Sequence, residues 1–209
     1  MKVRWSLLVA AFVFAAVSYA RPQLISEARS REVAKPLSGY DGKWWVAADD
    51  YEREGFFWGT SDCLTWTAHV GKGFYGTSTG MNADAFTRKV SDYYRAHPSD
   101  ITVPVISVWR KLGPEIGKAT PQTEGGEVYK TPHGFLDDGW YKSSSEAERF
   151  GFLEGYLGCL RTYVKDQEYS RPVHEYDDKI WDYYASHPKS YHEAIADVLF
   201  RFRDRPKAN

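Results

Sequence analysis

The chain has 209 residues, with 27 Lys and Arg against 28 Asp and Glu and a formal net charge of −1. This balance argues against nucleic acid or an anionic membrane surface as the main partner. Phe, Trp and Tyr make up 16% of the chain. We expect part of these rings to form the core and part to remain at the surface.

Residues 1–20 have the pattern of a secretory signal peptide. A basic start precedes an unbroken apolar run, Leu7 to Val17, and small residues lead to a cleavage site near Ala20. Such a run is too short to cross a bilayer and has the length of a signal peptide's apolar region. We expect a periplasmic or secreted protein without a membrane span in the mature chain, which carries 25 basic and 28 acidic residues and a net charge of −3.

The remaining sequence matches itself in three blocks. Residues 44–59 match 140–155 and Cys63 matches Cys159 at an offset of 96, while residues 89–98 match 179–188 at an offset of 90. Matches that keep their order and spacing indicate a tandem duplication. The prediction is an N-terminal arm at 21–40, a first helical module at 41–112, a connector at 113–138 and a second module at 139–205.

The first of three helices predicted in each module has a start signal in both copies. Asp49-x-x-Glu52 and Ser145-x-x-Glu148 stand at matching positions. In such a capping box each side chain accepts a hydrogen bond from a backbone N–H at the start of the helix. We therefore interpret Glu52 and Glu148 as capping residues and not as catalytic acids.

The second and third helices carry apolar residues at helical spacing in both copies. The second helix should end before Pro98 and Pro188, because proline disfavours helical geometry in the preceding residue. The third helix should begin at Asp100 and Ser190, with Pro104 in its first turn, where a missing N–H is tolerated. The fold class predicted is all-α: a tandem three-helix module forming a pseudo-twofold helical bundle.

Small residues form a narrow strip along each first helix. The strips are Gly55, Gly59 and Cys63 in one copy and Gly151, Gly155 and Cys159 in the other. Glycine inside a helix costs about 1 kcal/mol relative to alanine, which is tolerable where another backbone comes very close. The strips either face each other across a pseudo-twofold axis or each receive a helix of their own copy. The first arrangement places Cys63 beside Cys159, and an oxidising compartment would join them as a disulfide; otherwise two buried thiols remain.

Two arginines lie near the start of the first helices, where the helix dipole disfavours a cation. Aspartates repeated on the second helices are candidate partners, so we predict ion pairs Arg53–Asp92 and Arg149–Asp182. The alternative is that these arginines bind an anion.

The sequence contains no motif that predicts an enzyme, a metal site or a cofactor. His97 and His187 stand just before proline at the end of the second helix, where histidine bonds free carbonyl groups. The other histidines lack metal-ligand spacing, and there is no nucleophile elbow, zinc motif or phosphate loop. We predict a protein without chemistry of its own.

The segments Gly151–Cys159 and Tyr183–Pro188, followed by an amphipathic helix, resemble the Rap1a/Tai family. These are small exported helical proteins, some of which act as immunity proteins against amidase effectors delivered by type VI secretion. The resemblance implies an exported binding protein that inhibits a cell-wall-targeting enzyme, with an exported or injected protein enzyme as its partner.

A second hypothesis is peptidoglycan or carbohydrate binding, with Trp44, Trp45, Trp140 and Tyr141 as exposed stacking platforms. The same four residues precede the first helix in each copy, so they could instead hold that helix to the core.

Overall fold

The computed structural model describes residues 40–69, 83–116, 134, 136–164 and 169–204. The predicted signal peptide, the arm up to residue 39 and most of the connector lie outside the described residues. The described part is helical and contains no β-strand, which confirms the all-α class. None of its helices combines the length and the apolar character that crossing a bilayer requires.

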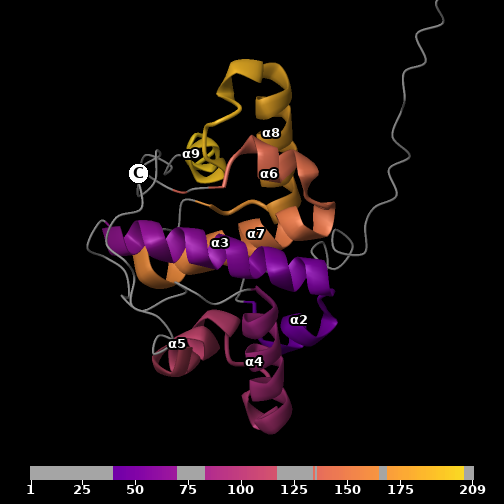
Figure 1. The fold of residues 1–209 in the computed structure, drawn as a ribbon, viewed down its shortest axis with the longest axis vertical. Helices are drawn as coiled ribbons and strands as arrows, with labels where there is room; N and C mark the ends of the chain where they lie inside the picture. Colours follow the sequence, from indigo (N-terminus) through magenta and orange to yellow (C-terminus); the bar gives the residue numbers. More distant parts are fainter. Residues whose placement is uncertain (1–39, 70–82, 117–133, 135, 165–168, 205–209) are drawn as a thin grey trace, which may run out of the picture.

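The elements follow one another in the same order in both halves. The first half contains α2 (Gly42–Ala47), α3 (Asp50–His69), α4 (Ala83–Ala96), the short 3-10 helix η1 (Pro98–Asp100) and α5 (Val105–Ile116). The second contains α6 (Asp138–Ser143), α7 (Glu146–Cys159) with the π-helical turn η2 (Leu160–Val164), α8 (Val173–Ser186), η3 (Pro188–Ser190) and α9 (Ile195–Phe200). In Figure 1, α3 and α7 lie side by side across the middle, with α2, α4 and α5 at one end and α6, α8 and α9 at the other.

Capping explains why α3 and α7 begin where they do. The Ser145 hydroxyl accepts from the N–H of Glu148 at 3.2 Å, and the Glu148 carboxylate accepts from the N–H of Ser145 at 2.7 Å, which completes a capping box. In the first half, the Asp49 carboxylate accepts from the N–H of Glu52 at 2.8 Å. The capping box predicted for the second half is confirmed, and in the first half the capping role of Asp49 is confirmed.

The short helices α2 and α6 were not predicted. The Asp41 carboxylate accepts from the N–H groups of Lys43 and Trp44, and the Asp137 carboxylate accepts from Gly139. An Asp followed by Gly within two residues was the available signal, because aspartate is a strong N-terminal cap.

The predicted start of the third helix is wrong in both halves. Asp100 and Ser190 end the 3-10 helices η1 and η3, and the third helices begin only at Val105 and Ile195. In the first half, Pro104 precedes α5 and lies outside its first turn, where its backbone pairs with Asp41 in an isolated β-bridge. The first residue of each third helix makes an equivalent backbone hydrogen bond to a distant segment. The N–H of Val105 donates to the Tyr40 carbonyl at 2.7 Å, and the N–H of Ile195 donates to the Leu136 carbonyl at 2.8 Å.

The two glycine strips face each other, which is the first of the two predicted arrangements. A methyl group built on Gly55 would stand 2.8 Å from the carbonyl carbon of Glu148, and one built on Gly151 would stand 2.8 Å from that of Glu52. Methyl groups on the other two strip glycines, Gly59 and Gly155, would likewise meet backbone atoms of Phe152 and Phe56. The backbones of α3 and α7 are therefore in direct contact.

The predicted disulfide is confirmed. Cys63 and Cys159 are bonded, with their Cα atoms 6.1 Å apart, and 96 positions separate them in the sequence. Both residues are fully buried. The bond joins α3 to the end of α7, so the two halves are linked covalently at the centre of the molecule.

We expect Gly151→Ala to lower the free energy of unfolding by about 3 kcal/mol, because the added methyl group meets backbone that cannot move aside cheaply. Gly158→Ala in the same helix is the matched control. Its methyl group would find its nearest neighbour 3.8 Å away, at the Tyr40 ring. This control should raise stability by up to about 1 kcal/mol, the ordinary helix preference for alanine. Urea unfolding followed by circular dichroism measures both, and equal effects at the two positions would contradict the packing described above.

Candidate functional site

The four candidate binding aromatics do not form an exposed platform, and that prediction is wrong. Trp44 and Trp45 are 1% exposed and Tyr141 is fully buried. Trp140 is half-buried and packs on Phe152, with ring centroids 5.4 Å apart. The short helices α2 and α6 turn these side chains inward, in agreement with the alternative interpretation that they hold the first long helix to the core.

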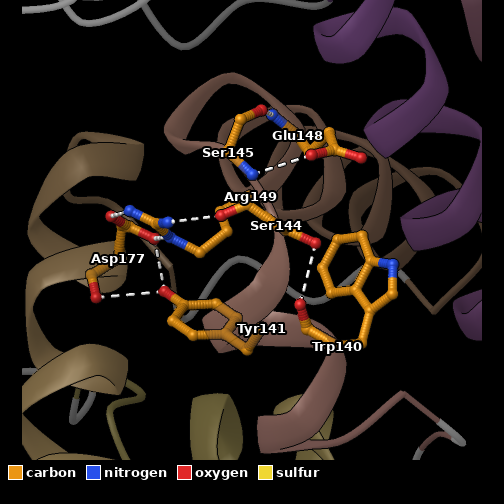
Figure 2. A network of polar contacts seen from close by, with 7 residues as sticks. All are labelled: Trp140, Tyr141, Ser144, Ser145, Glu148, Arg149 and Asp177. Atoms are coloured by element: carbon orange, nitrogen blue, oxygen red, sulfur yellow. Dashed lines mark hydrogen bonds and ion pairs between the residues drawn. The ribbon is translucent and has the colours of Figure 1, made fainter.

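The predicted pair Arg149–Asp182 is also wrong, because Arg149 pairs with Asp177 on the same helix α8 (Figure 2). The Arg149 Nε lies 2.9 Å from Asp177 Oδ1 and its Nη2 lies 3.2 Å from Oδ2, so two N–H groups of one guanidinium meet two oxygens of one carboxylate. The side chains are 10% and 5% exposed. Asp182 is exposed on α8.

Two aromatic rings lie against the guanidinium of Arg149. The guanidinium carbon lies 5.3 Å from the Tyr141 ring centroid and 5.0 Å from that of Trp181. The Tyr141 hydroxyl donates to the Asp177 carboxylate, as Figure 2 shows. Burial and the neighbouring Asp177 charge raise the pKa of Tyr141 well above its usual value, so the phenol remains a donor. Burial acts to lower the pKa of Arg149, but its hydrogen bonds with Asp177 and the charge of that carboxylate raise it.

The predicted pair Arg53–Asp92 is wrong as well. Arg53 donates from Nη1 to Asp50, one turn earlier in α3, at 3.0 Å, and Asp92 pairs with Arg95 on its own helix at 2.8 Å. The Asp50 and Asp92 side chains are 90% and 66% exposed. These are surface pairs, which contribute little to stability.

Both arginines lie near the start of a helix, where the helix dipole disfavours a positive charge. Backbone carbonyl groups at the ends of the short helices α2 and α6 offset this unfavourable interaction. Arg53 donates from Nε to the Trp45 carbonyl at 2.8 Å, within the last turn of α2. Arg149 donates from Nη1 to the carbonyl of Ser144, the C-cap of α6, at 3.0 Å. The carbonyl end of a helix is its negative end and leaves acceptors unpaired, so it favours a cation.

The candidate site is a hollow of about 370 Å³ between α2, α3 and α4. Its lining residues are Trp45, Val46, Arg53, Ser91, Tyr94 and Arg95. The Trp45 indole N–H donates to the Ser91 hydroxyl at 3.0 Å, and the Arg53 guanidinium carbon lies 5.8 Å from the centroid of the Trp45 ring. The hollow therefore combines two cations with aromatic walls.

His97 and His187 are located as predicted, at helix ends. Nδ1 of His97 lies 2.9 Å from the Tyr93 carbonyl and Nδ1 of His187 lies 2.9 Å from the Tyr183 carbonyl. Each imidazole also stacks on the ring of the same tyrosine. Among the described residues, no group of three or more His, Cys, Asp or Glu side chains is placed to hold a metal ion.

Sequence reasoning missed Asp177 and the hollow. Asp177 adjoins the apolar face of its helix, next to Tyr176 and one turn before Ile180 and Trp181, and this position was the available signal for a buried carboxylate. The hollow has no sequence signal of its own, because it depends on which side chains of α4 fail to fill the space beside α3.

Comparisons of the chain with protein-family models, with curated proteins and with solved structures found no match. The class of protein is therefore defined by its own fold and site. It is a helical protein whose two central helices are joined by a disulfide, with an arginine-containing hollow beside one of them.

Proposed function

We propose that the chain is an exported, non-enzymatic binding protein that inhibits a cell-wall-targeting enzyme. One observation carries the binding function: a hollow with arginine and aromatic walls opens on the first half of a covalently linked helical scaffold. Arginine is among the residues that contribute most at protein interfaces, and the Arg95 side chain that lines this hollow is 77% exposed. A scaffold that is rigid before binding also loses less entropy when the partner docks.

The disulfide supports the proposed export. Disulfides persist in oxidising compartments and are rare in the cytosol. The Cys63–Cys159 bond is therefore consistent with a periplasmic or extracellular location. We further propose that the two halves arose from one duplicated module, which the recurrence of equivalent backbone contacts at offsets of 96 and 90 supports.

The kind of partner follows from the resemblance to Rap1a/Tai proteins. An inhibitor of this type binds an amidase and blocks its active site or its access to peptidoglycan. Exposed aromatic platforms would favour the competing carbohydrate-binding hypothesis, and the burial of Trp44, Trp45 and Tyr141 removes that support.

Immobilised mature protein incubated with periplasmic extract tests the proposal. We expect it to retain a peptidoglycan hydrolase, and we expect that enzyme, once purified, to lose its activity on isolated peptidoglycan at an equimolar amount of this protein. Retention on peptidoglycan itself, without any captured enzyme, would contradict the proposal and favour carbohydrate binding.

A further inference from the structure

The surroundings of the two equivalent arginines differ at two positions of the second long helix. At the offset of 90 that aligns α4 with α8, Thr87 corresponds to Asp177 and Ser91 corresponds to Trp181. In the second half both residues contact the arginine: Asp177 pairs with Arg149, and the Trp181 ring lies against its guanidinium. The first half therefore lacks both the carboxylate and the ring that enclose the arginine in the second half.

This difference leaves positive charge facing the hollow. The Arg53 side chain is 19% exposed, and the acceptors that it meets are the carbonyls of Trp45 and Val46 and the carboxylate of Asp50. A guanidinium has five N–H groups, so two of them meet no acceptor within the described part of the chain. The Asp50 carboxylate is 90% exposed and is screened by water.

A second arginine adds to this charge. Arg95 lines the same hollow, and its counterpart at the offset of 90 is Ala185. Its own partner is the exposed carboxylate of Asp92. The hollow is thus cationic at the positions where the second half is neutralised or uncharged.

We propose that the hollow binds a carboxylate, which lies beside Arg53 as the Asp177 carboxylate lies beside Arg149. The assignment rests on the proposed binding function and names the group that this surface recognises. A guanidinium fits a carboxylate because its planar N–H groups can meet both oxygens at once. The Arg53 side chain is only 19% exposed, and this partial removal from water strengthens such a pair.

The rim of the hollow identifies the source of the carboxylate. Val46 lines the hollow and is 65% exposed, so the bound group meets an apolar surface beside the cations. A small free acid would leave this surface in water. An aspartate or glutamate side chain of a protein partner brings further atoms that cover it, so we assign the carboxylate to an acidic side chain of the partner.

A pair of small probes tests the chemistry directly. N-acetyl-aspartate α-methylamide and N-acetyl-asparagine α-methylamide differ only in a side-chain carboxylate against an amide. In the NMR spectrum of the full mature protein, the Trp45 indole N–H reports on the hollow through its bond to Ser91. We expect the aspartate probe to shift this resonance in a saturable way and the asparagine probe to leave it in place. Equal shifts with the two probes, or none with either, would overturn the proposal.

Two variants at one position separate charge from shape. Thr87→Asp installs the carboxylate that the second half has at Asp177, and Thr87→Asn adds nearly the same volume without charge. Thr87 is half-buried on α4, so both variants should fold. We expect Thr87→Asp to weaken binding of the aspartate probe about tenfold or more, since the new carboxylate should pair with Arg53 as the equivalent Asp177 pairs with Arg149. The Asn variant should bind as the parent does, and equal binding by the Asp variant would overturn the proposal.

The complex with the captured enzyme distinguishes the two sources of a carboxylate. If the carboxylate belongs to the partner, Thr87→Asp and Arg53→Gln should weaken that complex while Thr87→Asn does not. If the probe binds but the complex is unaffected, the carboxylate site stands with a small free acid as its ligand, and its assignment to the partner is overturned. Absence of any complex with the parent protein contradicts the proposed function and leaves the probe result unchanged.

Discussion

Replacing Asp177 with alanine is expected to lower the free energy of unfolding by about 3–5 kcal/mol, because Arg149 would stay buried without its carboxylate. The Arg149 side chain is only 10% exposed, and both its Nε and its Nη2 bond to Asp177. The Tyr141 hydroxyl donates to the same carboxylate, so it loses an acceptor as well. Urea unfolding of the oxidised protein at neutral pH, followed by circular dichroism, measures the change.

Asp182→Ala is the matched control for this loss. Asp182 carries the same charge on the same helix but is exposed, so its removal should change stability by less than about 0.5 kcal/mol. The double variant Arg149→Met/Asp177→Val removes both charges and should recover much of the loss, because a buried pair replaced by apolar residues is often neutral for stability. Similar effects for Asp177→Ala and Asp182→Ala would show that the buried pair is not where the structure places it.

Loss of the Cys63–Cys159 disulfide is the second large effect that we expect. The bond closes a loop of 96 positions, and the chain-entropy model gives a loss of about 4–5 kcal/mol for a loop of this length. The native arrangement of α3 and α7 should persist, since the glycine contacts hold the two backbones together without the bond. Urea unfolding with and without a reducing agent measures the loss, and the slope should rise on reduction because the unfolded chain exposes more surface.

The variant Cys63→Ala/Cys159→Ala provides the control for this experiment. Its stability should match that of the reduced parent to within about 1 kcal/mol, the small cavity terms aside, and a reducing agent should leave it unchanged. Each single substitution should lose nearly as much as the double one, since either breaks the bond. If the stability losses of the two single variants instead summed to the loss of the double variant, the two cysteines would contribute separately and not through a shared bond.

Close backbone packing along the glycine strips could be predicted because it depends on the spacing of residues within one helix, whereas the sequence left open whether the strips face each other. Four-residue steps of glycine and cysteine define a strip on any α-helix, and the repeat at an offset of 96 showed that two such strips exist. Helix boundaries were predicted where a capping side chain marks them, as at Ser145. They were missed where a tertiary contact sets them, as at Ile195, whose N–H bonds to the Leu136 carbonyl from a distant segment.

The partners of the arginines could not be predicted for a related reason. Asp92 and Asp182 were predicted as partners because both halves contain an aspartate at this position, as both contain the arginine. The actual partner of Arg149 is Asp177, which has Thr87 as its counterpart. The match between the two halves of the sequence indicates what they share, whereas this site depends on how they differ.

The contact between α3 and α7 restricts which substitutions the glycine positions on these helices can accept in evolution. In an ordinary core, a larger residue can be accommodated when a neighbouring side chain becomes smaller. Gly55, Gly59 and Gly151 face peptide groups of the opposite helix, and every amino acid has the same peptide group. No second substitution can make room there, so these sites are expected to stay glycine in any descendant of this sequence that keeps the fold.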